Sequence, residues 1–166
     1  MNEGIEKRVC FTGHRTLGRD FSKRKAYQLM QQLYEKGVDT FICGGAIGFD
    51  MEIAYLVLEL QIEHPEVQLW LFLPCNNYDA KWDIRDKNRM KTLLKYASYI
   101  DCPDTPYYDG VMKARNYKMV DNSLYCVSYF NGKRVSGTAQ TIRYAKRSGR
   151  QIFNLCDKGM AVVETL

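Results

Sequence analysis

The chain has 166 residues, of which 46% are hydrophobic and 13% aromatic, and its formal net charge is +5. This composition predicts one folded globular domain over residues 1–166 and excludes a disordered chain. No apolar run reaches the length of a membrane span, and the dispersed basic residues argue against nucleic acid as a partner. The densest basic cluster, around Lys146 and Arg147, is expected to be the solvated face of a late helix.

The apolar pattern predicts strands and helices in regular alternation, with no repeat or linker between them. The second helix is apolar on most sides and is expected to be well buried. Mostly continuous apolar strands that alternate with helices are typical of a parallel sheet covered on both faces. We therefore expect a Rossmann-like, doubly wound α/β fold with a mainly parallel sheet of six or seven strands. In chain order, the predicted elements are a strand at 8–12, a helix at 20–36, a strand at 39–43, a helix at 49–63, a strand at 67–73, a helix at 83–96, a strand at 98–102, a helix at 110–121, a strand at 124–130, a helix at 136–148 and a strand at 151–156.

The numbers and spacing of cysteine and histidine indicate the redox compartment of the protein and whether it could bind a metal ion. The first seven residues are polar without a signal-peptide core, and no C-x-x-C pair is present, so we expect a reduced, cytoplasmic protein. The two imidazoles, His14 and His64, are far apart in sequence, so we expect no metal site, and the sequence singles out no cofactor. Each cysteine lies in or just after a predicted strand, where it is expected to act as a small buried hydrophobe. The six are Cys10, Cys43, Cys75, Cys102, Cys126 and Cys156.

The most informative stretch is Gly44-Gly45-Ala46-Ile47-Gly48-Phe49-Asp50, between the second strand and the second helix. A strand, a glycine turn and a helix in this order direct backbone N–H groups and a helix N-terminus at an anion. Gly44 and Gly45 can take positive φ, and their N–H groups and that of Ala46 are candidates for phosphate contacts. Asp50 could cap the helix or accept a ribose hydroxyl. The alternative is a turn that needs glycine only for packing.

Further candidates follow the carboxyl ends of other strands, where folds of this kind bind ligands. Gly13, His14 and Arg15 follow the first strand, and His14 could bond a ligand or only fix its own loop. Tyr78 and Trp82 follow the third strand and could stack on a base or fill the interface between helix and sheet.

A second glycine turn, Ser136-Gly137-Thr138, opens the last long helix and is another candidate phosphate site. Thr138 could donate its hydroxyl to phosphate, cap the helix, or do both. Arg115, followed by Asn116, could pair bidentately with phosphate or be a surface side chain of its helix. These segments converge on one edge of the predicted sheet, which indicates a site for an anionic small molecule.

Four motifs follow one another along nearly the whole chain: Phe11-Thr12-Gly13-His14-Arg15, Gly44-Gly45-Ala46-x-Gly48-x-Asp50, Arg115-Asn116-x-x-Met119-Val120-Asp121 and Ser136-Gly137-Thr138-x-x-Thr141. Together they resemble the YpsA-like branch of the SLOG superfamily, which groups the DNA-processing protein DprA with the Lonely Guy (LOG) phosphoribohydrolases. The resemblance implies a Rossmann-like domain with a site for a nucleotide or a nucleotide derivative.

The resemblance is incomplete at one position that matters for catalysis. LOG enzymes cleave the N-glycosidic bond of nucleoside monophosphates with an Arg, which Arg115 resembles, and a P-G-G-x-G-T-x-x-E loop. At the position of that glutamate this chain has Thr141, which can neither act as a general base nor hold a negative charge near an oxocarbenium ion. Asp50 or Asp121 could replace the missing carboxylate in space.

Three functions remain open at this point. The favoured one is a sensor or regulatory domain that binds a nucleotide-derived ligand, such as an ADP-ribose-like, NAD-like or nucleotide-sugar molecule. The second is a nucleoside-phosphate N-glycosidase with Arg115 and Asp50 as candidate catalytic residues. The third and weakest, from the resemblance to DprA, is single-stranded DNA binding, which predicts a concentrated basic groove with stacking aromatics. LOG relatives dimerise, so the resemblance also implies a homodimer.

Overall fold

The computed structural model describes residues 4–166. The polar stretch 1–7, which was expected to lack a signal-peptide core, therefore lies partly outside the described residues, and its last part forms a short 3-10 helix, η1 (Ile5–Lys7). The strands are β1 (Arg8–Gly13), β2 (Thr40–Cys43), β3 (Gln68–Phe72), β4 (Tyr99–Asp101), β5 (Tyr125–Tyr129) and β6 (Gln151–Asn154). The helices are α1 (Lys23–Glu35), α2 (Phe49–Glu63), α3 (Ile84–Tyr96), α4 (Val111–Asp121), α5 (Gly137–Arg147) and α6 (Met160–Thr165), with a second 3-10 helix, η2 (Asp157–Gly159). Within residues 4–166, none of the helices has both the length and the apolar character that crossing a membrane requires.

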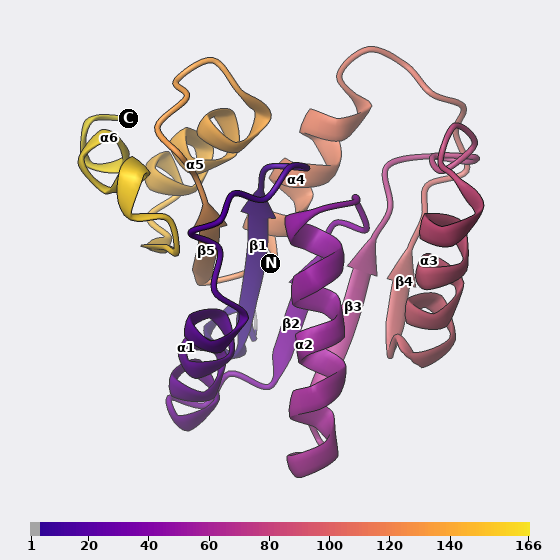
Figure 1. Cartoon of the computed structure of the whole chain (residues 1–166), viewed down its shortest axis with the longest axis horizontal. Coiled ribbons are helices and arrows are strands. Elements are labelled where there is room, and N and C mark those ends of the chain that lie inside the picture. Colours follow the sequence, from indigo (N-terminus) through magenta and orange to yellow (C-terminus); the bar gives the residue numbers. More distant parts are fainter. Residues whose placement is uncertain (1–3) are drawn as a thin grey trace.

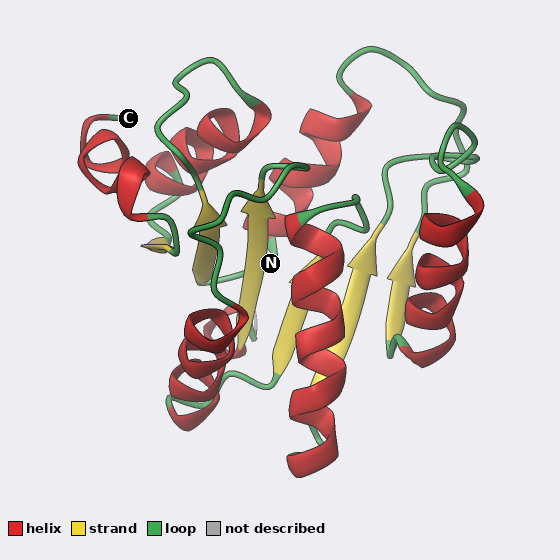
Figure 2. Cartoon of the chain, viewed as in Figure 1, coloured by secondary structure: helices red, strands yellow, loops and turns green. Residues whose placement is uncertain are grey.

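The six strands form one sheet in the order β4-β3-β2-β1-β5-β6, and every neighbouring pair is parallel. All the strands therefore end at the same edge, where loops lie above the arrowheads (Figure 2). The chain moves outward from β1 through β2, β3 and β4 and then returns to the other side of β1 with β5. This confirms the Rossmann-like prediction, with six strands. The reversal beside β1 is the switch point at which such folds bind ligands.

Helices cover both faces of the sheet, as predicted: α1, α2 and α3 lie on one face and α4 and α5 on the other (Figure 1). Because successive side chains of a strand point to opposite faces, each strand contributes to both cores. Val9 and Phe11 belong to the core under α1 and α2, whereas Cys10 packs with Met119 of α4. Helix α2 is buried along most of its length, which confirms the expectation for this apolar segment.

The first helix begins three residues later than the predicted start at residue 20. Ser22 is its N-cap, and the Ser22 hydroxyl accepts a hydrogen bond of 3.2 Å from the Lys25 N–H. Asp20 has a different partner, because its carboxylate accepts a hydrogen bond of 2.6 Å from the Tyr129 hydroxyl. That contact holds the residues before Ser22 as a loop beside the end of β5.

Two side-chain environments differ from the predictions. Cys102 is exposed rather than buried, because it follows β4, a short strand at the edge of the sheet. Lys146 does not belong to a freely solvated face, because its ammonium group donates to the main-chain carbonyls of Val163 and Leu166 at 3.0 and 3.3 Å. These bonds attach α6 to α5.

Candidate functional site

Two adjoining cavities lie at the edge of the sheet where the strands end. The wide cavity, of about 740 Å³, is lined by the turn after β2, the loop 74–82 after β3, Tyr107 and the start of α4. The narrow cavity, of about 240 Å³, is lined by residues 12–15 after β1, by Asp50, by α4 and by the start of α5. Both share a wall that consists of Arg15, Ala46, Met112 and Arg115.

Most of the predicted site residues come together here. The narrow cavity is lined by Gly13, His14, Asp50, Asn116, Gly137 and Thr138, the wide cavity by Gly45, Tyr78 and Trp82, and both cavities by Arg15, Ala46 and Arg115. Three predicted residues, Gly44, Gly48 and Ser136, line neither cavity. Contact of any of these residues with a ligand stays a prediction.

The sequence analysis missed several lining residues, among them Lys81, Tyr107 and Met112. A signal existed for Met112, because it precedes Arg115 by three residues on the same helix and therefore shares its face. Lys81 and Tyr107 lie in loops that follow β3 and β4, and no periodic pattern marks which loop side chains turn inward.

Arg115 is a buried side chain rather than a surface one, with 8% of its surface exposed. Its guanidinium donates to the main-chain carbonyls of Gly44 and Phe72, at the ends of β2 and β3. Its Nε donates to Asn116 Oδ1 at 2.7 Å, so Asn116 holds the orientation of the guanidinium plane. Burial lowers the pKa of Arg115 while Asp50 raises it, and the group remains a cation at neutral pH.

Asp50 lies in the first turn of α2, with 7% of its surface exposed. Its Oδ1 has no hydrogen-bond partner among residues 4–166. Burial raises the pKa of the carboxyl group to about 6, although Arg115 and the N–H of Ala46 oppose the rise. At neutral pH the cavity wall therefore presents a negative charge with an unsatisfied oxygen, which a hydroxyl or N–H donor from a ligand would satisfy.

The side chains of Asp50 and Arg115 leave no room for a side chain at position 44. A Cβ atom at Gly44 would lie 2.7 Å from Asp50 Oδ2 and 2.9 Å from Arg115 Nη1, closer than such atoms pack. The first glycine of the turn is therefore needed because protein side chains occupy the space beside it.

The N-terminus of α2 is filled by the chain itself. The Phe49 N–H donates to the His14 carbonyl at 3.2 Å, and the main chain of Arg15 packs against Gly48, whose φ is +82°. The Ala46 N–H faces the Asp50 carboxylate. This turn offers a ligand fewer free N–H groups than its sequence predicts.

The N-terminus of α5 is open to the narrow cavity. The N–H groups of Gly137 and Thr138 donate to no other group of the described chain, and a Cβ atom on Gly137 would meet nothing within 4 Å. Ser136 is the N-cap: its hydroxyl accepts from the Ala139 N–H at 3.1 Å and donates to the Lys133 carbonyl at 2.7 Å. Free N–H groups at a capped helix N-terminus are suited to a phosphate.

His14 joins two loops as well as lining the narrow cavity. Its Nε2 accepts a hydrogen bond of 3.2 Å from the Asn131 N–H, which links the loop after β1 to the loop after β5. Burial lowers the pKa of His14, and an accepting Nε2 must be unprotonated. The ring at neutral pH is therefore neutral, with its proton on Nδ1.

Tyr78 and Trp82 form one wall of the wide cavity. Their rings meet edge to face, with centroids 5.6 Å apart, and both pack against the core. The Tyr78 hydroxyl is buried without a hydrogen-bond partner in residues 4–166, and burial raises its pKa. The two rings thus contribute to packing and to the cavity at once, and the hydroxyl is a donor that a ligand could use.

The positions of Asp50, Asp121 and Thr141 show which carboxylate could replace the missing glutamate of the LOG motif. Thr141 lines neither cavity, and its hydroxyl donates to the Gly137 carbonyl at 2.9 Å. Asp121 ends α4 and accepts a hydrogen bond of 2.6 Å from the Tyr144 hydroxyl, away from both cavities. Asp50 is the one carboxylate among the lining residues.

The charges at the site suit an anionic ligand rather than a metal ion. Arg15, Lys81 and Arg115 line the wide cavity, which has no carboxylate in its wall. The described part of the chain contains no group of three or more His, Cys, Asp and Glu side chains that could hold a metal ion.

Residues 12–155, most of the sequence, match a family model, that of the YspA SLOG family. The chain belongs to the YspA SLOG family. Its relatives include a UPF0398 protein of Halalkalibacterium halodurans, which is 22% identical over 140 residues and matches 83% of this chain and 74% of that one. A UPF0398 protein of Latilactobacillus sakei is 25% identical over 122 residues, with 68% and 66% of the two chains covered. The resemblance that the four motifs indicated is thereby confirmed.

The fold is also similar to that of a solved protein. DNA processing protein A from Helicobacter pylori, studied for its single-stranded DNA binding mode, matches with a TM-score of 0.67 and 18% sequence identity. The match covers 90% of this chain, and this chain spans only 65% of that one. At this identity the similarity establishes a common fold, and that protein has a substantial part that this chain does not match.

Proposed function

We propose that this SLOG-family chain binds a nucleotide or nucleotide-derived ligand across the two cavities, as a sensor or regulatory domain. The observation that carries the proposal is the buried Asp50 Oδ1, which lacks a protein partner among residues 4–166 and lines the same narrow cavity as the open N-terminus of α5. A ribose phosphate has the matching groups, because a hydroxyl can donate to Asp50 while the phosphate accepts from Gly137 and Thr138.

The wide cavity is the place for the rest of the ligand. Tyr78, Trp82 and Met112 line it, and aromatic and thioether side chains pack well against a planar base. The order along the site would then be phosphate at α5, ribose at Asp50 and base toward Tyr78. Arg115, at the shared wall, neutralises the ligand's charge without leaving its own main-chain partners.

Binding is tested with a thermal-shift panel followed by calorimetry on the full chain. The panel holds the common nucleoside mono-, di- and triphosphates, NAD, ADP-ribose and nucleotide sugars. A ligand at about one hundred times its dissociation constant stabilises a protein by about 2.7 kcal/mol, which a thermal shift detects. We expect stabilisation by one class of compound, much reduced in Asp50→Asn, reduced in Thr138→Ala, which removes the hydroxyl but keeps the N–H group, and retained in Glu59→Gln, which changes an exposed carboxylate of the same helix α2. Absence of binding by every compound would contradict the proposal.

A second candidate is hydrolysis of a nucleoside-phosphate N-glycosidic bond, favoured by the pKa of about 6 at Asp50 beside Arg115. Water would form a bond to C1′ of the ribose as the bond from C1′ to the base nitrogen breaks. Asp50 would take the proton of the attacking water, and the departing base would be protonated from solvent. Chromatography of nucleoside monophosphates incubated with the protein tests this, with base release expected to disappear in Asp50→Asn and Arg115→Ala. Release that survives both substitutions would rule out this site as its source.

Single-stranded DNA stays a third candidate, and the expectation that nucleic acid is not a partner has no support from the findings. That expectation rested on basic residues that are dispersed along the sequence. In the structure, however, Arg134, Arg143 and Arg147 line one hollow of about 420 Å³ beside α5. The similar solved protein was studied for binding single-stranded DNA. Anisotropy of a labelled thymidine oligonucleotide at several salt concentrations is the test, because phosphate contacts give a steep salt dependence. The homodimer implied by the LOG relatives remains a prediction.

A further inference from the structure

Two cations in the wide cavity have no role in the ligand order above. We propose that Arg15 and Lys81 form a second anion subsite, so that the ligand of this protein carries a second phosphate besides the one at α5. This inference rests on the proposed function and narrows it from any nucleotide to nucleotides with two phosphate groups.

The charge of the wide cavity is the first support. Arg15, Lys81 and Arg115 line it, and none of the lining residues is acidic. Arg115 is held by main-chain carbonyls, whereas Arg15 and Lys81 form no ion pair and no side-chain hydrogen bond with another residue of the described chain. Two unpaired cations in one cavity attract an anion more strongly than either alone.

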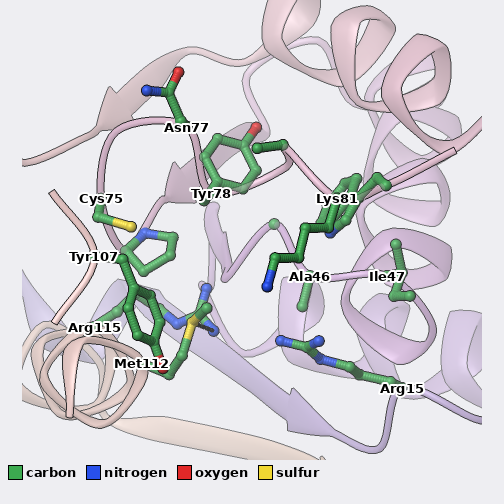
Figure 3. Close-up of a pocket in the computed structure, with 14 residues that line it drawn as sticks. Arg15, Ala46, Ile47, Cys75, Asn77, Tyr78, Lys81, Tyr107, Met112 and Arg115 are labelled. Carbon is green, nitrogen blue, oxygen red and sulfur yellow. Dashed lines mark hydrogen bonds between the residues drawn. The ribbon is translucent and has the colours of Figure 1, made fainter. Parts of the chain in front are cut away.

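The direction of the two side chains is the second support. Figure 3 shows the Lys81 ammonium and the Arg15 guanidinium both directed into the cavity beside Ala46, although they come from different loops. Asn77, in the same loop as Lys81, points away from the centre of the cavity (Figure 3). The loop thus turns a cation inward.

Both loops are fixed at their main chain, so the two side chains start from defined positions. Arg15 follows His14, whose carbonyl accepts from the Phe49 N–H, and its own main chain packs against Gly48. Lys81 lies in a turn in which the Ala80 N–H donates to the Asn77 carbonyl at 3.1 Å. A subsite built on fixed loops loses less entropy when the ligand binds.

Size is the third support. The narrow cavity, of about 240 Å³, is suited to a ribose phosphate, whereas about 740 Å³ is within the range that holds an entire drug-sized ligand. A base alone would leave much of the wide cavity empty. A second phosphate between Arg15 and Lys81 would use both the remaining space and the unpaired charge.

The chemistry that the subsite recognises is a second phosphate, which can be joined to the first or carried elsewhere on the nucleoside. Calorimetry on the full chain separates these sources. The probes are the monophosphates and diphosphates of the four ribonucleosides, adenosine 3′,5′-bisphosphate and ADP-ribose. Preference for a diphosphate or for ADP-ribose would indicate a diphosphate bridge, and preference for the bisphosphate would indicate separate phosphates.

We expect at least one two-phosphate compound to bind about tenfold or more tightly than its monophosphate, which corresponds to about 1.4 kcal/mol. Lys81→Met and Arg15→Met should reduce this ratio to about threefold or less, because each removes one cation but keeps an unbranched apolar side chain. Lys81→Arg should keep the ratio. The matched control, Lys91→Met, changes an exposed lysine of α3 that lines neither cavity and should keep the ratio too.

The outcomes separate this inference from the function on which it rests. Monophosphates that bind as tightly as every two-phosphate compound would overturn the second subsite and leave nucleotide binding intact. A preference that survives both methionine variants would also overturn it. Failure of all probes to bind would overturn the proposed function and this inference together.

Discussion

Asp50 and Arg115 approach the same point beside Gly44 from different helices, yet they form no ion pair within 4.0 Å. Both are buried, and burial is the largest influence on the pKa of each, upward for the acid and downward for the base. Their attraction therefore does not compensate for the loss of water around them. The burial of these two charges therefore opposes folding, and buried charges of this kind in the wall of a cavity are typical of a functional site.

Asp50→Asn should stabilise the protein at neutral pH. The pKa of Asp50 is raised from 3.8 to about 6, a difference of about two units, which at about 1.4 kcal/mol per unit amounts to about 3 kcal/mol. For an acid with a raised pKa, this penalty is absent below the unfolded value and is complete once the pH passes the folded value. Denaturant unfolding of both proteins should therefore give similar free energies at about pH 3 and a gap that widens up to about pH 7.

Glu52→Gln is the matched control for that experiment. Glu52 lies in the same turn of α2, but it pairs with Lys23 at 3.3 Å and with Arg89 at 3.0 Å. Burial would raise the pKa of Glu52, yet the bonds from Arg89 and Lys23 outweigh it and lower the pKa. This substitution should destabilise the protein at neutral pH. If Asp50→Asn destabilises it as well, the carboxylate of Asp50 is not under the strain described here.

The ionisation of Asp50 should also set the pH dependence of ribose recognition. A carboxylate accepts a hydroxyl more strongly than a neutral carboxyl group does, so the preference for a ribonucleotide over its deoxy analogue should grow as the pH rises through about 6. The analogues are the 2′-deoxy and 3′-deoxy monophosphates, whose phosphate titrates near the same pH and so cancels from the ratio. Calorimetry between about pH 5 and about pH 8 measures it. A ratio that does not change with pH would mean that Asp50 does not accept a ribose hydroxyl.

Gly44→Ala should damage the site although it adds one methyl group. The new Cβ would lie within 3 Å of both Asp50 Oδ2 and Arg115 Nη1, so one of these side chains must move. Overpacking of this kind typically costs about 1–3 kcal/mol, and we expect nucleotide binding to weaken with it. Gly137→Ala is the control for stability, because a Cβ there meets nothing within 4 Å. Denaturant unfolding should show a loss for the first variant and little change for the second.

The fold was predictable because its signals are local. The alternation of continuous apolar strands with helices determined the order of the elements. Helices α1, α3 and α5 each begin after a polar residue, Ser22, Asp83 and Ser136, that needed only its next turn to act as a cap. The start of α1 was misplaced because Asp20 bonds to Tyr129, a contact across 109 residues that no local pattern reveals.

The site was only partly predictable, because its chemistry depends on contacts between distant segments. The glycine turn predicted an anion site at the N-terminus of α2, but the Phe49 N–H at that end donates to the carbonyl of His14, in the loop after β1. The Gly44 carbonyl in the same turn accepts a hydrogen bond from Arg115, which is 71 residues away. The open helix end is that of α5. The sequence named both Asp50 and Asp121 as replacements for the missing glutamate and favoured Asp50, and the position of each relative to the cavities separates them in space.

Tyr129→Phe should loosen the loop that carries Arg15. The Tyr129 hydroxyl donates to Asp20 Oδ1 at 2.6 Å and accepts from the Gly18 N–H at 3.0 Å, and burial raises its pKa to about 12, so it stays a donor. The Cys156 thiol donates to the other oxygen of Asp20 at 3.0 Å, which leaves that carboxylate one partner after the substitution. A lost hydrogen bond to a charged group amounts to about 1.5–3 kcal/mol when it is buried, and this one is partly exposed.

Hydrogen exchange of the amides between Arg15 and Ser22 measures the effect. We expect it to accelerate by about tenfold, which corresponds to about 1.4 kcal/mol of local stability, while exchange in β1 and β5 changes little. Nucleotide affinity should fall in parallel, since Arg15 belongs to the wall shared by both cavities. Tyr125→Phe is the control, because Tyr125 lies on the same face of β5 and its hydroxyl makes no hydrogen bond to this loop among residues 4–166, and it should leave the loop unchanged. Equal exchange in the two variants would mean that the Tyr129 hydroxyl does not hold this loop.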